Sequence, residues 1–303
     1  MALVMAGAVA ANLFAAPLAF TPPDAQLAFE TADGLVKNCT PRNAGTPEGL
    51  RAARWLREVL VTHGIPAFLE MFTAPTPYGT KSFANVVVEQ RSSNAQAPWI
   101  VVLSHFDTAP NVGPSFEGAN DGASTCGLLL AVAKAVRRSK DTSVNWMFVW
   151  TDGEECMKEY GANDGFQGSR HLARRFVKEG RKVKAAVCLD MLGDRDLGIV
   201  LPANTTPSLA DAAFQAARQT RLASRLAQDK TIVISDDHTP FLAAGYPAID
   251  FIDFSFGSKP GANDYWHTNQ DTMDKISLQS LSDAGRLVCA FFNILNTVEF
   301  NER

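Results

Sequence analysis

The chain has 303 residues, of which 46% are hydrophobic, and a formal net charge of −4. This length and apolar content are sufficient for one large globular domain with a substantial core. The weak negative charge argues against nucleic acid as a partner and against binding to an anionic membrane surface. Five cysteines occur without a C-x-x-C pair, so the sequence indicates neither a structural zinc site nor a redox motif.

The first 23 residues contain no charged side chain. We interpret residues 1–19 as a signal peptide that ends near Ala16 or Ala19, which predicts a secreted or periplasmic protein. No Lys or Arg precedes the apolar run and no clean Ala-x-Ala site ends it, so an uncleaved anchor or a core helix is the alternative. No other stretch is long enough to span a bilayer, so we expect no stable membrane insertion after processing.

Helical and strand patterns alternate through residues 24–303. The predicted helices cover 24–38, 46–63, 122–138, 169–179, 208–222, 238–244 and 277–298. The predicted strands cover 67–72, 83–89, 99–104, 144–150, 184–190, 197–201, 231–235 and 247–252. Neither an internal repeat nor a low-complexity segment interrupts the alternation. The pattern predicts a single α/β domain over residues 24–303, with a mostly parallel central sheet flanked by helices.

Two adjacent carboxylates, Glu154 and Glu155, follow the predicted strand 144–150 at its carboxyl end. In a parallel sheet the functional groups gather where strands end and loops begin, so this position favours a site. One carboxylate of such a pair can bind a metal ion while the other stays free to move protons. A solvated acidic turn is the structural alternative when the pair is considered alone.

Other side chains that commonly bind metals stand at the ends of other predicted elements. They are His105, Asp107, Asp121, Asp190 and His267. Singly, His105 is compatible with a core imidazole, Asp121 with a helix cap and His267 with a surface histidine. Their joint placement at element ends favours one common site. Histidine and carboxylate ligands without a thiolate suit zinc in a catalytic site.

Five motifs that contain these residues follow one another in chain order. They are Ser104-His105-Phe106-Asp107, Gly118-Ala119-Asn120-Asp121-Gly122-Ala123-Ser124, Asp152-Gly153-Glu154-Glu155, Leu189-Asp190-Met191 and Trp266-His267-Thr268. Over residues 40–298 the chain resembles the zinc aminopeptidase family that also contains the animal-type glutaminyl cyclases. The resemblance implies a zinc-aminopeptidase-like fold and an enzyme that acts on peptide or protein substrates with a free N-terminus.

Three details resemble the cyclase branch more than the aminopeptidases. An acidic pair, Asp236-Asp237, precedes His238, where the aminopeptidases usually have Ser-Asp-His. The segment 168–173 after the Glu pair and Trp266 directly before His267 are also cyclase-like. Together these details favour a glutaminyl-peptide cyclotransferase.

The sequence also departs from the cyclase pattern at two places. Tyr160 stands about where the cyclases place a pocket tryptophan, which puts the fit of the substrate in question. Ser104 stands where animal cyclases often have a cysteine, so Cys126 lacks the partner of that disulfide. The missing bridge affects stability only.

By this resemblance, Asp121, Glu155 and His267 hold one zinc ion, whose fourth position stays open for a substrate carbonyl oxygen. Glu154, Asp190 and Asp236 are implied to be the catalytic carboxylates, and Glu154 to carry a proton from the α-ammonium group to the departing nitrogen. Trp266 and Tyr160 are implied to enclose the glutamine side chain. The implied reaction, for which we expect a monomer, is conversion of N-terminal glutamine to pyroglutamate with release of ammonia.

The same scaffold in a hydrolytic aminopeptidase binds two metal ions, which is the alternative. His105 and Asp190 would then complete the second site, and Asp121 would bridge the two ions. Asp236 discriminates between the two, because a proton shared with Asp190 across a short hydrogen bond would leave Asp190 a poorer ligand. A binding module without catalysis is the third alternative, which the presence of Glu154 and of every candidate ligand disfavours.

Overall fold

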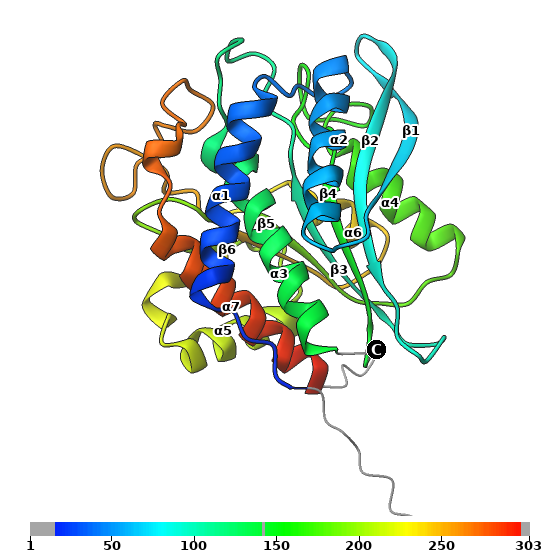
Figure 1. Ribbon diagram of the computed structural model, residues 1–303, viewed down its shortest axis with the longest axis vertical. Coiled ribbons are helices and arrows are strands. Elements are labelled where there is room, and N and C mark those ends of the chain that lie inside the picture. Colours follow the sequence, from blue (N-terminus) through cyan, green and yellow to red (C-terminus); the bar gives the residue numbers. More distant parts are fainter. Residues whose placement is uncertain (1–15, 141–142, 298–303) are drawn as a thin grey trace, which may run out of the picture.

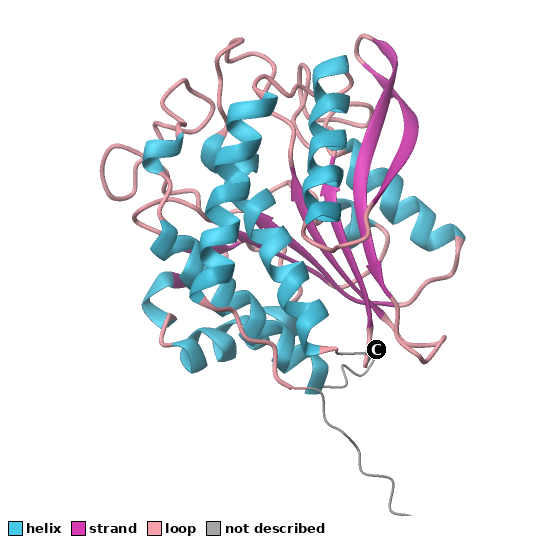
Figure 2. Ribbon diagram, viewed as in Figure 1, coloured by secondary structure: helices cyan, strands magenta, loops and turns pink. Residues whose placement is uncertain are grey.

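The computed structural model describes residues 16–140 and 143–297. In these ranges the chain forms one eight-stranded sheet with helices on both faces (Figure 1, Figure 2). The strands are β1 (Phe68–Thr76), β2 (Gly79–Gln90), β3 (Trp99–His105), β4 (Asn145–Thr151), β5 (Val183–Asp190), β6 (Ile199–Leu201), β7 (Leu226–Gln228) and β8 (Ala248–Ile252). The helices are α1 (Pro22–Cys39), α2 (Pro47–Thr62), α3 (Thr125–Ser139), α4 (Gln167–Lys178), α5 (Pro207–Thr220), α6 (Thr239–Ala243) and α7 (Leu278–Thr297).

The strand order is β1-β2-β4-β3-β5-β8-β6-β7. The central strands β4, β3, β5 and β8 run parallel to one another, whereas β2 and β6 join them antiparallel. The chain leaves β3 for β4 on one side and then returns from β4 to β5 on the other side of β3. This reversal opens a crevice at the carboxyl ends of the central strands, which is where α/β sheets bind ligands.

Alternate residues of the central strands pack into two separate cores. In β3, Ile100 and Val102 join the core that lies under α1, α2, α3, α5 and α7. Val101 and Leu103 face the smaller core under α4 and α6. Every residue of β3 is buried, as expected of a strand covered on both faces. The predicted single α/β domain with a largely parallel sheet is therefore confirmed.

The helices begin where the sequence supplies caps. Thr46 accepts a hydrogen bond from Gly49 N at 3.2 Å, and Pro47 follows in the first turn of α2. At the start of α1, Asp24 accepts hydrogen bonds from the backbone N–H and the hydroxyl of Thr21. Gly127 allows α3 to approach α1 closely, since a Cβ there would lie 2.0 Å from Ala28 O.

The predicted strand 231–235 is wrong. This segment is a loop in which Ile232 and Val233 are 52% and 68% exposed, while the short strand β7 forms earlier and pairs with β6. The run of β-branched residues has strand propensity, but the segment has no place in the strand order of the sheet and so lacks the hydrogen-bonded ladder that a strand needs. The loop instead borders the cavity described below.

Residues 1–15, the larger part of the predicted signal peptide, lie outside the described residues. The segment that follows packs against α7. Leu18 is buried, its N–H donates to Asn293 Oδ1 at 2.8 Å, and its carbonyl accepts from Asn293 Nδ2 at 2.9 Å. Among the helices of the described residues, none has both the length and the apolar content needed to cross a membrane.

Candidate metal centre and active site

The candidate site residues converge at the carboxyl ends of the parallel strands. His105 is the last residue of β3 and Asp190 the last of β5, while Glu154 and Glu155 follow β4. A cavity of about 610 Å³ opens there. Its walls include Asp121, Glu154, Glu155, Tyr160, Asp190, Asp236, Trp266 and His267. Residues far apart in the sequence are thus brought to one place by the sheet.

One group of candidate ligands consists of Asp121, Glu155 and His267. His267 Nε2 lies 2.9 Å from Glu155 Oε1 and 3.3 Å from Asp121 Oδ2. One ligand atom from each of the three residues lies within 4.8 Å of the others. In a tetrahedral zinc site with bonds of about 2.0–2.1 Å, neighbouring ligand atoms are roughly 3.3 Å apart. The group therefore matches the dimensions of a zinc site.

A second group shares Asp121 with the first. His105 Nε2 lies 3.1 Å from Asp121 Oδ1 and 3.2 Å from Asp190 Oδ1, and all three side chains are buried. His105 Nδ1 is 3.2 Å from the carbonyl oxygen of Asp107 and can donate to it. Nε2 then faces two carboxylates, an arrangement that either a protonated imidazole or a second cation satisfies.

Asp121 points into the site because the helix that carries it is distorted. The sequence predicted a helix from residue 122, but α3 begins at Thr125 and a π-helical turn, Ala119–Ser124, precedes it. Asp121 and Gly122 have non-helical backbone angles, and Gly122 has a φ of 94°. A Cβ on Gly122 would lie 3.1 Å from the ring of His105, so a glycine permits this close approach.

A carboxylate that the sequence did not reveal holds the backbone of this turn. Asp271 Oδ1 accepts a hydrogen bond from Asn120 N at 2.7 Å, and Oδ2 accepts one from Asp121 N at 3.1 Å. Burial, followed by the charge of Asp121, raises the pKa of Asp271 to about 7. Asp271 stands four residues after His267. One loop thus contacts Asp121 twice, because the imidazole of His267 lies beside the side chain of Asp121 and the carboxylate of Asp271 binds its backbone N–H.

The loop that carries Glu154 and Glu155 is held in the same manner. Asp107 Oδ1 accepts hydrogen bonds from Gly153 N at 3.0 Å and Glu154 N at 3.2 Å, and Oδ2 accepts one from Glu155 N at 3.1 Å. Its position after β3 makes Asp107 a candidate metal ligand in the sequence. The structure places its carboxylate on three backbone amides instead, where it fixes the direction of the Glu pair.

The two glutamates differ in their electrostatic surroundings. Burial raises the pKa of Glu155 to about 7, helped by the charge of Asp121 and opposed by the hydrogen bond to His267. Burial also raises the pKa of Glu154 well above its ordinary value, and the charges of Glu155, Asp236 and Asp237 add to the effect while His105 opposes it. A raised pKa suits a carboxyl group that takes up and releases a proton during a reaction.

The histidine and aspartate of the first group shift in opposite directions. Burial acts to lower the pKa of His267, but hydrogen bonds to Asp121 and Glu155 raise it to about 10. Burial acts to raise the pKa of Asp121, but hydrogen bonds from His105 and His267 lower it below its ordinary value. These shifts show that the site is arranged around positive charge, which an imidazolium or a bound cation provides.

Asp236 is buried close to Asp190, and burial together with the charge of Asp190 raises its pKa to about 7. Within the described ranges no hydrogen bond joins the two carboxylates, so a proton shared between Asp190 and Asp236 remains a hypothesis. Asp236 Oδ1 accepts from the backbone N–H of Asp237 instead, and the thiol of Cys188 is close enough to oppose the rise in the pKa of Asp236. Asp190 therefore acts on Asp236 through its charge.

Asp237 and His238 have structural partners. Asp237 accepts hydrogen bonds from the hydroxyls of Thr151 and Ser169, the latter at 2.5 Å. His238 Nε2 lies 2.9 Å from Asn204 Nδ2, and burial lowers the pKa of His238 to about 4. A neutral, hydrogen-bonded imidazole at this place supports the loop that carries Asp236.

Aromatic side chains form the outer wall of the cavity. The hydroxyl of Tyr160 donates to Glu155 Oε2 at 3.4 Å, and its ring stacks on Phe166 with centroids 4.8 Å apart. Trp266 is half-buried and packs against Phe254 at 5.6 Å. Tyr160 is 41% exposed, so it stands at the mouth of the cavity rather than within it.

All five cysteines lie in the described part of the chain, and all are free. Cys126 is buried, and its thiol donates to the carbonyl oxygen of His105 at 3.1 Å. Ser104, at the place of the partner cysteine in the animal cyclases, donates its hydroxyl to Thr125 Oγ1 at 3.0 Å. These hydrogen bonds connect β3 to the start of α3 at the place where the animal cyclases often have a disulfide.

Comparison with known proteins agrees with the resemblance seen in the motifs. Residues 85–292 match the model of peptidase family M28. A glutaminyl-peptide cyclotransferase-like protein of Bos taurus is 25% identical over 279 residues, which cover 82% of this chain and 71% of the relative. The crystal structure of a glutaminyl cyclase from an Acidobacteriales bacterium is 32% identical and superposes with a TM-score of 0.83, covering 96% of this chain and 99% of the other.

The same fold also occurs in a protein with a different name. The structure of a leucine aminopeptidase precursor from Bacteroides thetaiotaomicron has a TM-score of 0.78 over 93% of this chain and 100% of its own, at 21% identity. At this identity the likeness concerns the fold alone. Fold similarity therefore does not separate cyclisation from hydrolysis, and the separation has to come from the site.

Proposed function

The chain belongs to peptidase family M28 and to the glutaminyl-cyclase branch of that family, and we propose that it is a zinc-dependent glutaminyl-peptide cyclotransferase. As an acyltransferase it converts the N-terminal glutamine of a peptide or protein to pyroglutamate. The α-amine forms a bond to the δ-carbon of its own side chain, the bond from that carbon to the amide nitrogen breaks, and ammonia leaves. No water is consumed.

The residues fit a zinc ion. Asp121, Glu155 and His267 offer two carboxylate oxygens and one imidazole nitrogen, a donor set that zinc prefers in catalytic sites. Asp121 Oδ2 is buried and lies 3.3 Å from His267 Nε2, which is about the separation of two ligand atoms on one zinc ion. When bound, zinc would act as a Lewis acid toward the carbonyl oxygen of the side-chain amide.

We assign proton transfer to Glu154. It lines the cavity beside Glu155, and its raised pKa suits a group that accepts a proton from the α-ammonium and then gives it to the departing nitrogen. Asp107 fixes the backbone N–H groups of both glutamates, so the two carboxylates keep separate directions. Asp190 and Asp236 lie next to the site and influence its charge, the first through its contact with His105.

Trp266 and Tyr160 are proposed to enclose the substrate. A compact glutamine side chain held against these rings would keep its δ-carbon near its own amine, and proximity of this kind accelerates intramolecular attack. The rings also exclude water, which would otherwise compete as a nucleophile. Tyr160 in place of the larger tryptophan of the cyclases leaves a wider mouth to the cavity.

The observation that carries the proposal is the division within the Glu pair. Glu155 stands 2.9 Å from His267 among the candidate ligands, while Glu154 faces the cavity in a setting that raises its pKa. The alternative, a two-zinc aminopeptidase, is supported by the second group around His105, Asp121 and Asp190. We favour the cyclase because the acidic pair Asp236-Asp237 before His238 is cyclase-like and because the 32% identical structure is a glutaminyl cyclase, whereas the aminopeptidase precursor is 21% identical.

A paired assay on one preparation tests the proposal. Glutaminyl-naphthylamide is followed for cyclisation by ammonia release, and leucyl-naphthylamide is followed for hydrolysis. We expect ammonia from the first and no free naphthylamine from the second. Hydrolysis of the leucyl compound without cyclisation of the glutaminyl compound would establish the aminopeptidase alternative. The zinc content of the same preparation is measured alongside.

The remaining assignments follow from the same function. We propose that the substrates are peptides or proteins with a free N-terminal glutamine and that the enzyme acts as a monomer. We further propose that residues before about Leu18 direct export, so that the mature enzyme works outside the cytoplasm.

A further inference from the structure

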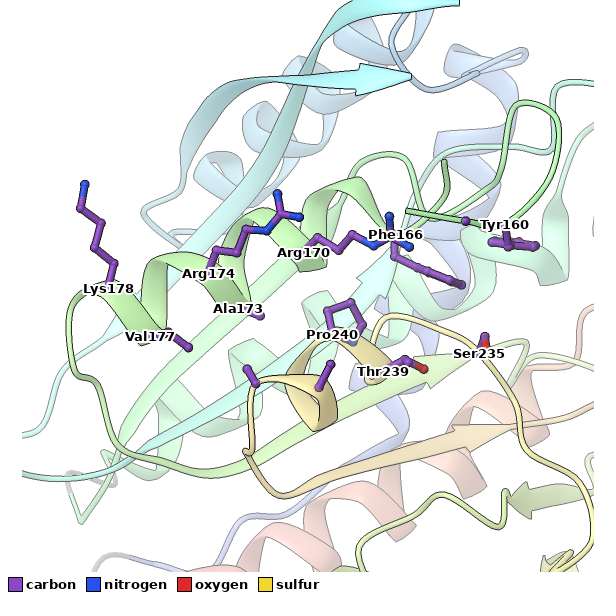
Figure 3. A pocket seen from close by; sticks show the side chains of 13 residues that line it. Tyr160, Phe166, Arg170, Ala173, Arg174, Val177, Lys178, Ser235, Thr239 and Pro240 are labelled. Atoms are coloured by element: carbon purple, nitrogen blue, oxygen red, sulfur yellow. The ribbon is translucent and has the colours of Figure 1, made fainter. Parts of the chain in front are cut away.

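A second hollow adjoins the catalytic cavity. It has a volume of about 710 Å³ and lies between α4 and α6. Tyr160 and Ser235 line both hollows, so the second is a continuation of the first. In Figure 3 these two residues stand at one end of the groove, and α4 leads away from them toward Lys178.

Three basic side chains follow one another along this groove. Arg170, Arg174 and Lys178 are spaced by four residues on α4 and all line the hollow (Figure 3). Arg170 is engaged, since its Nη1 donates to Ala162 O at 2.8 Å and its guanidinium lies 5.5 Å from the ring centroid of Phe166. Arg174 and Lys178 are exposed, and neither has an acidic partner in the described part of the chain.

This row of like charges has no evident value for the helix itself. Like charges four residues apart destabilise a helix by a few tenths of a kcal/mol each. The neighbouring cations of α4 and its end are neutralised, because Arg175 pairs with Glu70 and Arg181 with Glu179. Only the side of α4 that faces the groove keeps uncompensated positive charge, which indicates a negatively charged occupant.

We propose that this groove binds the segment of a peptide substrate that follows the N-terminal glutamine, and that it selects for acidic side chains there. The inference rests on the proposed function, which places the glutamine in the catalytic cavity. The rest of the peptide then leaves the cavity through its open rim, to which the exposed Tyr160 belongs. Ser235 and Tyr160 connect that rim to the groove, so the groove is the path that the chain meets first.

The spacing of the cations agrees with an extended peptide. Residues four apart on α4 are separated by ~6 Å along the helix axis. Side chains that point the same way from an extended chain are separated by roughly 6.6–6.8 Å. Acidic residues at alternate positions of the substrate would therefore meet Arg174 and Lys178 in turn. Apolar groups of Ala173, Val177 and Pro240 line the groove between them and offer contact to the peptide backbone.

The experiment uses three heptapeptide amides, Gln-Ala-Xaa-Ala-Xaa-Ala-Ala, in which Xaa is Glu, Gln or Lys. Cyclisation is followed by ammonia release, and kcat/KM is compared within each enzyme preparation, so that differences in folding or zinc content cancel. We expect the Glu peptide to exceed the Gln peptide about three- to tenfold at low ionic strength, since two exposed ion pairs contribute this much. The preference should shrink in about 0.5 M salt, because exposed charges are screened.

Charge reversal identifies the groove as the cause. In the double variant Arg174→Glu, Lys178→Glu, the kcat/KM of the Glu peptide should fall below that of the Gln peptide. The kcat/KM of the Lys peptide should rise relative to that of the Gln peptide. The matched control is Arg54→Glu, Arg57→Glu, which makes the same charge change at two exposed residues of α2 on the opposite face of the sheet. The control should keep the wild-type ratios. Equal loss in both double variants would overturn the proposal, because it would reflect net charge alone.

A binding measurement separates this proposal from the proposed function. The peptides, labelled at the carboxyl end, are titrated by fluorescence anisotropy with the Glu154→Gln variant, and the Glu peptide should bind about three- to tenfold more tightly than the Gln peptide. If wild type cyclises glutaminyl-naphthylamide but no peptide preference appears in either measurement, the groove proposal alone fails. If no substrate is cyclised, the proposed function fails, and an anisotropy ratio of one then overturns the groove as well.

Discussion

Asp271 accepts a hydrogen bond from the backbone of Asp121 while His267 contacts the carboxylate of Asp121, and the two loop residues are only four positions apart. Asp271 Oδ2 accepts from Asp121 N at 3.1 Å, and His267 Nε2 lies 3.3 Å from Asp121 Oδ2. The loop 267–271 therefore positions one candidate ligand, Asp121, and provides another, His267. Positioning groups of this kind commonly change metal affinity tenfold to a hundredfold when removed.

We predict that Asp271→Asn lowers zinc affinity about ten- to a hundredfold, because an amide can accept only one of the two backbone hydrogen bonds. Zinc is titrated against a chelator of known affinity, and circular dichroism verifies the fold. Asp274→Asn is the control, since Asp274 is three residues further on and 69% exposed at its side chain. Wild-type affinity in Asp271→Asn would show that the backbone of Asp121 is positioned without it.

The candidate ligands could be predicted from the sequence because the end of an apolar run indicates the end of a strand. Runs such as 99–104 and 144–150 are continuous and apolar, and His105 and Glu155 come just after them. Parallel strands bring such ends to one edge of the sheet, so convergence follows from the topology. Asp271 carries no such signal, because it lies in a loop and its partner is 150 residues away.

The loop 231–235 shows the opposite failure. Its residues have the composition of a strand, and composition is what a sequence displays most clearly. A strand needs a neighbouring ladder, and β8 already pairs with β5 and β6. Ile232 and Val233 are left exposed at the cavity instead, where they can contact a substrate. The same limitation applies to the turn before α3, whose distortion depends on the contact of Gly122 with His105.

We predict about one tightly bound zinc per chain after reconstitution and desalting. The reason is the cyclase-like acidic pair Asp236-Asp237, of which Asp236 is buried beside Asp190, the residue that would complete a second metal site. Elemental analysis gives the stoichiometry. Two equally tight zinc ions would favour the aminopeptidase alternative, and removal of the single ion by a chelator should abolish cyclisation.

Export should leave Leu18 in the mature protein. Leu18 is buried and makes two backbone hydrogen bonds with the side chain of Asn293, so cleavage near Ala16 preserves the packing and cleavage after Ala19 removes it. N-terminal sequencing of protein from the native host should begin at or before residue 18. The free energy of unfolding of a recombinant chain that starts at Phe20 should be about 2–4 kcal/mol lower than that of a chain that starts at Pro17, because the burial and hydrogen bonds of Leu18 are lost.

Asp24 should make stability depend on pH in the acid range. Burial acts to raise its pKa, but bonds from Arg138 and Thr21 lower it below the ordinary value of 3.8, with Arg138 Nη1 and Nη2 at 2.6 and 2.7 Å. Because the unfolded chain binds this proton more readily, the contribution is complete above about pH 4 and is lost as the pH falls through the lower folded pKa.

The test of this linkage is Asp24→Asn, which should destabilise the protein by about 1–3 kcal/mol at pH 7 and by progressively less in acid. Urea unfolding at several pH values measures the difference. Asp33→Asn serves as the control, because Asp33 makes an exposed pair with Lys37 on the same helix. A difference from wild type that stays constant down to pH 2 would mean that the carboxylate is not the source.

The two neighbouring glutamates should fail in different ways when each is changed to glutamine. Glu155→Gln removes a charge among the candidate ligands, so zinc affinity should fall strongly and activity should partly return when zinc is raised. Glu154→Gln is nearly isosteric and should keep zinc content near wild type while kcat falls by ~10²–10⁴, the usual contribution of a positioned acid–base group. KM should change little, since the lost interaction belongs to the transition state.

The contrast between these variants decides whether the division of roles is right, because each is the control for the other. Both substitutions replace an ionisable carboxyl group by a neutral amide in the same loop, which Asp107 holds through the backbone in either case. A general electrostatic effect would therefore alter metal content and rate alike in both. If Glu154→Gln loses the metal and Glu155→Gln does not, the roles are reversed. If both keep near-normal rates, proton transfer must come from another group at the cavity, and Asp236, with a pKa raised to about 7, would be examined next.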